Sequence, residues 1–118
     1  MTETRPAWAW LFFVHLSLVI AASVLATTGH FPAVVFRTPF DKIGHLVGYG
    51  GLAFLAVAFF SRRRWLLIVA VVLIAATLEE ISQRAFPTRT FDLGDLAMNW
   101  IGIVAGGIWG RRSRPPSA

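Results

Sequence analysis

Four long stretches of apolar residues, separated by short polar segments, dominate this chain of 118 residues. They predict helices at about residues 8–28, 43–60, 65–84 and 93–110. A helix that crosses a membrane needs about 20 residues, with a range of about 17–25. The pattern therefore predicts an all-α membrane protein, built as a single four-helix transmembrane domain over residues 1–110. Residues 111–118 are too polar and proline-rich to pack, and we expect them to form a disordered basic tail in the cytoplasm.

The third stretch has a polar end that the other helices must accommodate. It runs without a charge for only 14 residues before Glu79 and Glu80, which is about 21 Å of helix at 1.5 Å per residue. The hydrocarbon core of a bilayer is about 30 Å thick. If this helix spans, the two carboxylates lie below the outer membrane surface, where each needs a partner or a proton.

Charge predicts the orientation of the helices. Cytoplasmic loops of membrane proteins are enriched in Lys and Arg, and the basic residues here gather before the first stretch, between the second and third, and after the fourth: Arg5, Arg62, Arg63, Arg64, Arg111, Arg112 and Arg114. Both termini are therefore predicted to be cytoplasmic. The alternative that the first stretch is a signal peptide cleaved near Ala26 is disfavoured by its length, and it would leave the other three helices in the same orientation.

Composition agrees with a membrane protein. The chain is 56% hydrophobic and 14% charged, against about 45–50% and about 25% in soluble domains. The absence of cysteine excludes a disulfide scaffold, a thiolate metal site and a thiol nucleophile. The net charge of +5 comes from arginines beside apolar stretches, so we expect no nucleic-acid partner.

Polar residues of the second predicted helix fall on one helical face. Asp41, His45 and Tyr49 are four residues apart, which stacks them on the same side of a helix. Gly44 and Gly48 follow the same spacing and predict a close approach to a neighbouring helix.

The third and fourth predicted helices repeat this arrangement of polar positions. Glu80 and Gln83 are three residues apart, and Asp92, Asp95 and Asn99 follow spacings of three and four. A glycine stripe continues roughly the last face deeper in the membrane, at Gly102, Gly106 and Gly110. Polar groups from three helices then share one depth near the outer surface, which predicts a common cavity open to that side.

Several of these residues also have a purely structural interpretation. Asp92, with Asp95 three residues later, is typical of a helix N-cap with an acid in the first turn. His45 could be an interhelical hydrogen-bond donor, and Asp41 could simply begin its helix. Arg89 is the expected partner of one of the acids, or of a phosphate. We interpret His15 and His30 as structural.

Three sequence pieces together carry a resemblance. They are D-K-x-x-H-x-x-x-Y from Asp41, E-x-x-Q from Glu80, and P-x-R-x-F-D-x-x-D-x-x-x-N-x-x-G from Pro87. In this order they resemble the VanZ-like family over Asp41 to about Gly110. The resemblance implies a four-helix integral protein of the bacterial cytoplasmic membrane. It also suggests a link to resistance against the glycopeptide teicoplanin.

The leading hypothesis is an outward-facing site that binds, and could modify, a lipid or cell-envelope precursor. We predict catalytic roles for His45, Glu80 and Asp95. The predicted binding residues are Asp41, Lys42, Tyr49, Gln83, Arg89, Asp92 and Asn99, with Lys42 and Arg89 as candidates to hold a phosphate or carboxylate. We expect no cofactor for this function. A metal-dependent membrane enzyme is one alternative, since Asp, His and Glu can ligate a divalent ion. The other is a non-catalytic helical partner, a homo-oligomer included, assembled through the glycine stripes.

Overall fold

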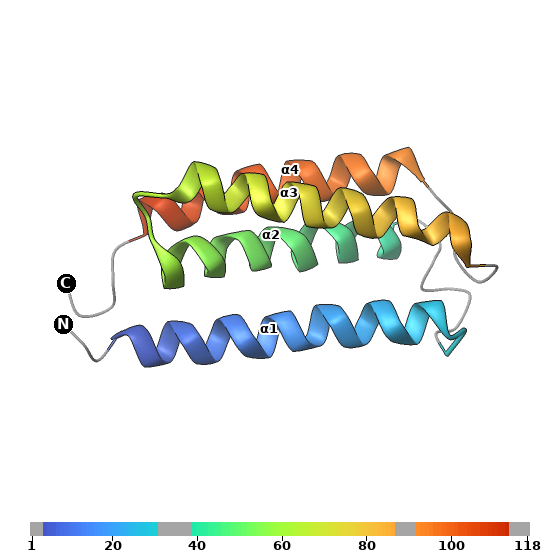
Figure 1. Cartoon of the computed structure of the whole chain (residues 1–118), viewed down its shortest axis with the longest axis horizontal. Helices are drawn as coiled ribbons and strands as arrows, with labels where there is room; N and C mark the ends of the chain where they lie inside the picture. The colour runs from blue at the N-terminus through green and yellow to red at the C-terminus, as the bar shows by residue number, and fades with distance from the viewer. Residues whose placement is uncertain (1–3, 31–38, 87–91, 114–118) are drawn as a thin grey trace.

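The structure, a computed structural model, describes residues 4–30, 39–86 and 92–113, with the backbone alone for residues 4–6. These residues form four α-helices: α1 (Thr4–Thr27), α2 (Phe40–Phe60), α3 (Trp65–Ser82) and α4 (Leu93–Arg112). A short 3-10 helix, η2 (Gln83–Ala85), continues α3. Each α-helix runs antiparallel to the one before it (Figure 1). The prediction of an all-α fold is confirmed for the described part of the chain.

Three of the helices are long and apolar enough to cross a membrane: Ala7–Thr27, Phe40–Phe60 and Trp65–Ala85. α4 is as long as a span, but Asp95, Asn99 and its terminal arginines lower its hydropathy. Large apolar side chains such as Leu18 and Ile74 are more than 60% exposed, whereas several polar side chains are buried. Apolar groups outside and polar groups inside are the arrangement expected of a protein that lies in a bilayer.

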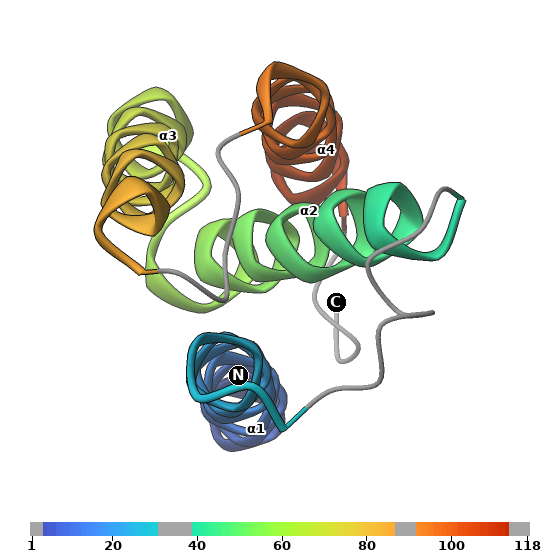
Figure 2. The same cartoon turned by 90° about the vertical axis from the view of Figure 1, so that its right-hand side faces the viewer.

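α2 lies at the centre of the bundle, with α1 on one side and α3 and α4 on the other (Figures 1 and 2). α2 and α4 pack backbone to backbone. A Cβ placed on Gly102 would lie 2.5 Å from the Leu46 carbonyl oxygen, and one on Gly110 would lie 2.7 Å from the Phe54 carbonyl oxygen. Between them, a Cβ on Gly106 would overlap the Gly50 carbonyl oxygen. The glycine stripe of α4 therefore holds α2 at close range.

The predicted glycine stripe on α2 does not take part in this contact. A Cβ on Gly44 would have nothing within 4 Å, and one on Gly48 would only reach a methyl of Val19 at 3.8 Å. The α2 face that meets α4 carries Leu46 and Gly50 instead. Gly44 and Gly48 are rotated toward α1, so the close helix approach expected of them is not found within this chain. A contact between copies of the chain through these glycines stays a prediction.

Five arginines of the positive-inside argument lie at the end of the bundle where α2 and α4 end and α3 begins. They are Arg62, Arg63, Arg64, Arg111 and Arg112. α4 runs through Arg111 and Arg112, so the predicted tail begins later than residue 111. Two effects favour this extension. Cations in a last turn interact well with the helix dipole, and the Arg111 guanidinium lies 5.1 Å from the centre of the Trp65 ring. Residues 114–118 are outside the described residues, and disorder there stays a prediction.

Candidate functional site

The polar residues of three helices meet at the end of the bundle opposite the arginines. α2 and α4 begin there and α3 ends there, so their polar turns face one another (Figure 1). Four of these residues are almost completely buried: Glu80 and Asn99 at 0% exposure of the whole residue, Gln83 at 3% and Asp95 at 4%. Buried polar groups in such a setting are costly unless they are bonded. Their partners therefore define the site.

Lys42 joins the start of α2 to the start of α4. Its ammonium lies 2.8 Å from Asp92 Oδ2 and 2.5 Å from Asp95 Oδ1. Asp92 is also the N-cap of α4, because its Oδ1 accepts a hydrogen bond from the Gly94 N–H at 2.7 Å. The Lys42 ammonium, helped by the Gly94 N–H, holds the pKa of Asp92 below its ordinary value of 3.8. Asp92 thus caps α4 and also forms an ion pair with Lys42 of α2.

His45 is the centre of a second set of contacts. Its Nδ1 lies 2.8 Å from Asn99 Oδ1, and its Nε2 lies 3.4 Å from Asp41 Oδ1 and 3.5 Å from Asp95 Oδ2. With its amide oxygen toward the ring, Asn99 can only accept, which makes His45 Nδ1 the donor of this hydrogen bond. His45 Nε2 therefore faces the two carboxylates. Asp95 divides its oxygens, one toward Lys42 and the other toward His45.

Glu80 accepts a hydrogen bond from the N-cap residue of α4. Its Oε1 accepts a hydrogen bond from the Asp92 N–H, and its Oε2 accepts one from Gln83 Nε2, both at 3.2 Å. In a capping box the acid at position N3, here Asp95, would bond the N-cap N–H. In this structure Glu80 of α3 takes that place, and Asp95 turns to Lys42 and His45. The expected capping box is therefore replaced by a contact between two helices.

Glu79 forms a further polar contact that the sequence patterns left aside. Its Oε1 accepts from the Ser23 hydroxyl at 3.0 Å, and its Oε2 is 3.5 Å from the Tyr49 hydroxyl. Gln83 Nε2 also donates to both oxygens of Glu79 at 3.2–3.3 Å. Glu79 thus ties α3 to α1 and α2. Ser23 is one of four hydroxyl residues in α1, so without knowledge of helix rotation it is a weak clue.

A cavity of about 540 Å³ lies beside these groups, between α1 and α2. Its wall is mostly apolar, and it is lined by Leu18, Val19 and Ala22 on α1 and by Ile43 and Val47 on α2. Its polar groups come from all three neighbouring helices: His15, Ser23, Asp41, His45, Tyr49 and Glu79.

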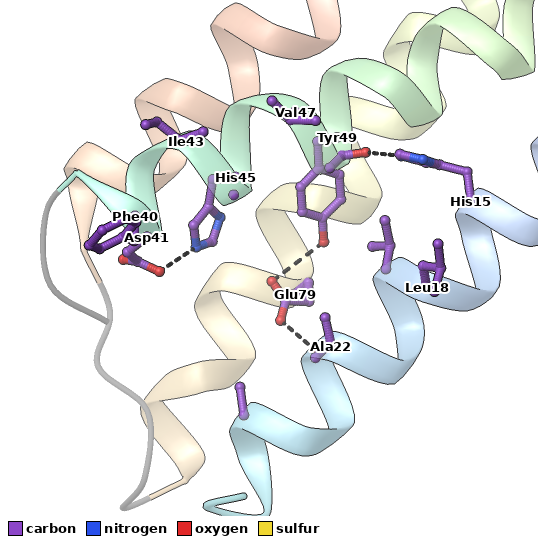
Figure 3. A pocket seen from close by; sticks show the side chains of 15 residues that line it. His15, Leu18, Ala22, Phe40, Asp41, Ile43, His45, Val47, Tyr49 and Glu79 are labelled. Atoms are coloured by element: carbon purple, nitrogen blue, oxygen red, sulfur yellow. Dashed lines mark hydrogen bonds and ion pairs between the residues drawn. The ribbon is translucent and has the colours of Figure 1, made fainter. Parts of the chain in front are cut away.

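One polar group of this cavity comes from the first helix. His15, which we interpreted as structural, lies there with its Nε2 2.7 Å from the Gly48 carbonyl oxygen (Figure 3). That contact fits the structural interpretation, and it also puts the ring in the cavity wall.

The predicted site residues thus fall into connected groups. One group surrounds His45 and Lys42 and contains Asp41, Lys42, His45, Asp92, Asp95 and Asn99. Glu80 and Gln83 adjoin it through the Asp92 N–H, and Tyr49 lies beside Glu79 in the cavity wall. Arg89 is outside the described residues. Of the predicted catalytic residues, His45 lines the cavity, whereas Asp95 and Glu80 lie behind it.

Comparison with known families identifies the chain. The sequence model of the VanZ/LLP1 family matches residues 3–110, which is nearly the whole chain. The chain belongs to this family. The match extends the resemblance drawn from Asp41 to Gly110 back through α1, so the helix that supplies one wall of the cavity is part of the VanZ/LLP1 unit. No curated protein and no solved structure matches the chain.

Proposed function

We propose that this VanZ/LLP1 protein is a four-span protein of the bacterial cytoplasmic membrane that binds a lipid or lipid-linked envelope precursor from the outer side. α4 supplies the fourth span in this proposal. Its 20 residues are about 30 Å of helix, and its polar residues face the other helices. The five described arginines at one end, opposite the acids, favour an orientation with both termini in the cytoplasm.

The observation that carries the proposal is the cavity between α1 and α2. Small-molecule sites combine a mostly apolar lining with a few convergent polar groups, and this cavity does so along the bundle. The apolar part between Leu18 and Val47 suits an acyl or prenyl chain. The polar part, at Asp41, His45, Tyr49 and Glu79, suits a headgroup at the depth of the membrane surface (Figure 3).

The polar side chains at this end of the cavity limit which kinds of lipid headgroup fit. Lys42 is engaged by two carboxylates and is not among the residues that line the cavity. The described part of the lining is therefore rich in acceptors, and it suits a headgroup with hydroxyl or amine donors. An anionic headgroup would need a cation that bridges it to Asp41. If the bound lipid is modified, His45 is the candidate general base or acid, because it lines the cavity and contacts Asp41 and Asp95.

A pair of adjacent substitutions tests lipid binding. Ala22→Phe puts a ring into the cavity, whereas Ala21→Phe puts the same ring on an exposed position that does not line it. The protein is purified in mild detergent, and lipids that remain bound are identified by native mass spectrometry. We expect wild type and Ala21→Phe to carry a lipid adduct and Ala22→Phe to lose it. Equal adducts in the two variants would contradict a lipid site between α1 and α2.

The link to glycopeptide resistance is tested in cells with the same pair. If the site acts on an envelope precursor whose abundance limits teicoplanin action, expression of wild type and Ala21→Phe should lower teicoplanin susceptibility. Ala22→Phe, present at equal membrane level, should not. If expression of wild type leaves teicoplanin susceptibility unchanged, the chain has no role in resistance. Lipid binding would then be judged by the mass-spectrometric test alone.

A further inference from the structure

Three ligand-type atoms converge beside the cavity. His45 Nε2, Asp41 Oδ1 and Asp95 Oδ2 come from the first two turns of α2 and the first turn of α4. One ligating atom from each of these residues lies within 4.8 Å of the other two. Their side chains are only 12%, 19% and 6% exposed, respectively. Imidazole and carboxylate are both ligands for divalent transition metals.

The distances from His45 Nε2 to the two carboxylates fit ligands that share an ion better than hydrogen-bonded partners. A charge-assisted N–H···O bond is about 2.7–2.9 Å long, and His45 Nε2 lies 3.4 and 3.5 Å from the two carboxylate oxygens. Around Zn²⁺, nitrogen and oxygen ligands at about 2.0–2.2 Å in tetrahedral geometry are about 3.4 Å apart. The two distances from His45 Nε2 thus match adjacent ligands of one ion, and the ligating atoms of all three residues lie within 4.8 Å of one another.

The surrounding contacts orient these ligands as those of a metal site. Ligating histidines almost always donate their other N–H to an oxygen, and His45 Nδ1 donates to Asn99 Oδ1. The second oxygen of Asp95 is held by Lys42, which leaves Oδ2 directed at His45. Asn99 is fully buried, and its Nδ2 has no hydrogen-bond partner among the described residues. A buried donor of this kind is explained by a water or ligand oxygen next to the site.

We propose that Asp41, His45 and Asp95 bind a divalent transition-metal ion, with Zn²⁺ or Mn²⁺ as the best matches to one imidazole and two carboxylates. Three protein ligands leave a position open for water or substrate, as in catalytic metal sites. Asp41 and His45 both line the cavity, so this position is reachable from there. The ion would bridge a phosphate or carboxylate headgroup to the acidic end of the cavity. That role rests on the proposed lipid function, whereas the metal site does not.

Metal binding is tested on the full chain, purified through a tag without histidine and offered Zn²⁺, Mn²⁺ or Co²⁺ without added lipid. We expect about one ion per chain by mass spectrometry of the metal after gel filtration, and a tetrahedral visible spectrum with Co²⁺. His45→Ala and Asp95→Asn should weaken binding by more than the roughly 10–100-fold expected for loss of an outer contact, and Asn99→Ala should fall within that range. His30→Ala, which removes an exposed histidine near the same end of the bundle, should bind as wild type does.

Two readouts keep the proposal falsifiable if a variant fails to fold. Circular dichroism shows which variants retain their helices. On wild type alone, electron spin echo measurements with bound Cu²⁺ should detect one imidazole nitrogen. Wild type that retains no ion, or His45→Ala that binds as tightly as wild type, would overturn the site. An ion-free wild type with both His45 nitrogens protonated by ¹⁵N NMR would also overturn it and would assign His45 to an ion pair. Ala22→Phe should keep the metal while losing lipid, so each proposal can fail separately.

Discussion

The contact between α2 and α4 makes a quantitative prediction about Gly102. A Cβ there would lie 2.5 Å from the Leu46 carbonyl oxygen, about 0.9 Å inside the 3.4 Å at which ordinary contact begins. The obstacle is backbone, so it cannot rotate away, and the helices must separate. Overpacking of this kind costs about 1–3 kcal/mol. Against this, replacing glycine by alanine within a helix gains up to about 1 kcal/mol. Gly102→Ala should therefore lose up to about 2 kcal/mol of stability.

Gly44→Ala is the matched control, because a Cβ at Gly44 would have nothing within 4 Å. It receives the same gain in helix propensity without the steric cost. The difference between the two variants thus isolates the overpacking energy, about 1–3 kcal/mol in favour of Gly44→Ala. Reversible unfolding of the purified proteins in mixed detergent micelles, followed by circular dichroism, measures it. A Gly102→Ala variant as stable as Gly44→Ala would refute the backbone-to-backbone packing of α2 and α4.

Further predictions concern the polar contacts. Glu80→Ala should lower the free energy of unfolding by roughly 1–3 kcal/mol, because it leaves the Asp92 N–H unpaired. Glu80→Gln should cost less, because its amide oxygen can still accept that bond. Equal losses in the same unfolding assay would argue against the Asp92 bond. Thr77→Val removes the acceptor of the Trp100 indole N–H at 3.0 Å and should cost about 0.5–1 kcal/mol, with a shift in tryptophan emission. The pKa of Asp92 is lowered in the folded protein, chiefly by Lys42, so its stabilising effect is complete above pH 3.8 and is lost as the pH falls through the lower folded value. Unfolding midpoints measured against pH should show this loss in wild type and not in Asp92→Asn; identical profiles would exclude it.

Periodicity predicted much of this arrangement because spacing along one helix is a local property. Asp41 and His45 share a face in the sequence and in the structure, as do Asp95 and Asn99. How each helix is rotated against its neighbours is not local. The same spacing rule singled out Gly44 and Gly48, yet Gly50 meets α4, because the sequence does not say which of several glycine-bearing faces turns toward which helix.

Glu79 shows the same limit at the end of α3. It lies about 100° around the helix from Glu80, and the sequence interpretation gave a site role to Glu80 alone. Glu80 is buried and bonds the N-cap residue of α4. Glu79 instead contacts α1 through Ser23, 56 residues away in the chain. Contacts at that separation depend on how α1 packs, and α1 carries no polar pattern that would reveal it. The position of Arg89 lies outside the described residues, so its pairing with an acid stays a prediction.

The central position of α2 separates the proposed metal ligands from α1 (Figure 2). Every proposed metal ligand stands on α2 or α4, and these two helices are locked together by the glycine contacts. α1 lines the other side of the cavity, and its polar contacts with the rest of the bundle include His15 with Gly48 and Ser23 with Glu79. In the proposed function, a lipid chain would lie against α1 while the metal ligands on α2 and α4 keep their geometry. The proposed headgroup and metal contacts would then belong mainly to α2, α3 and α4, and the proposed chain contacts to the face between α1 and α2.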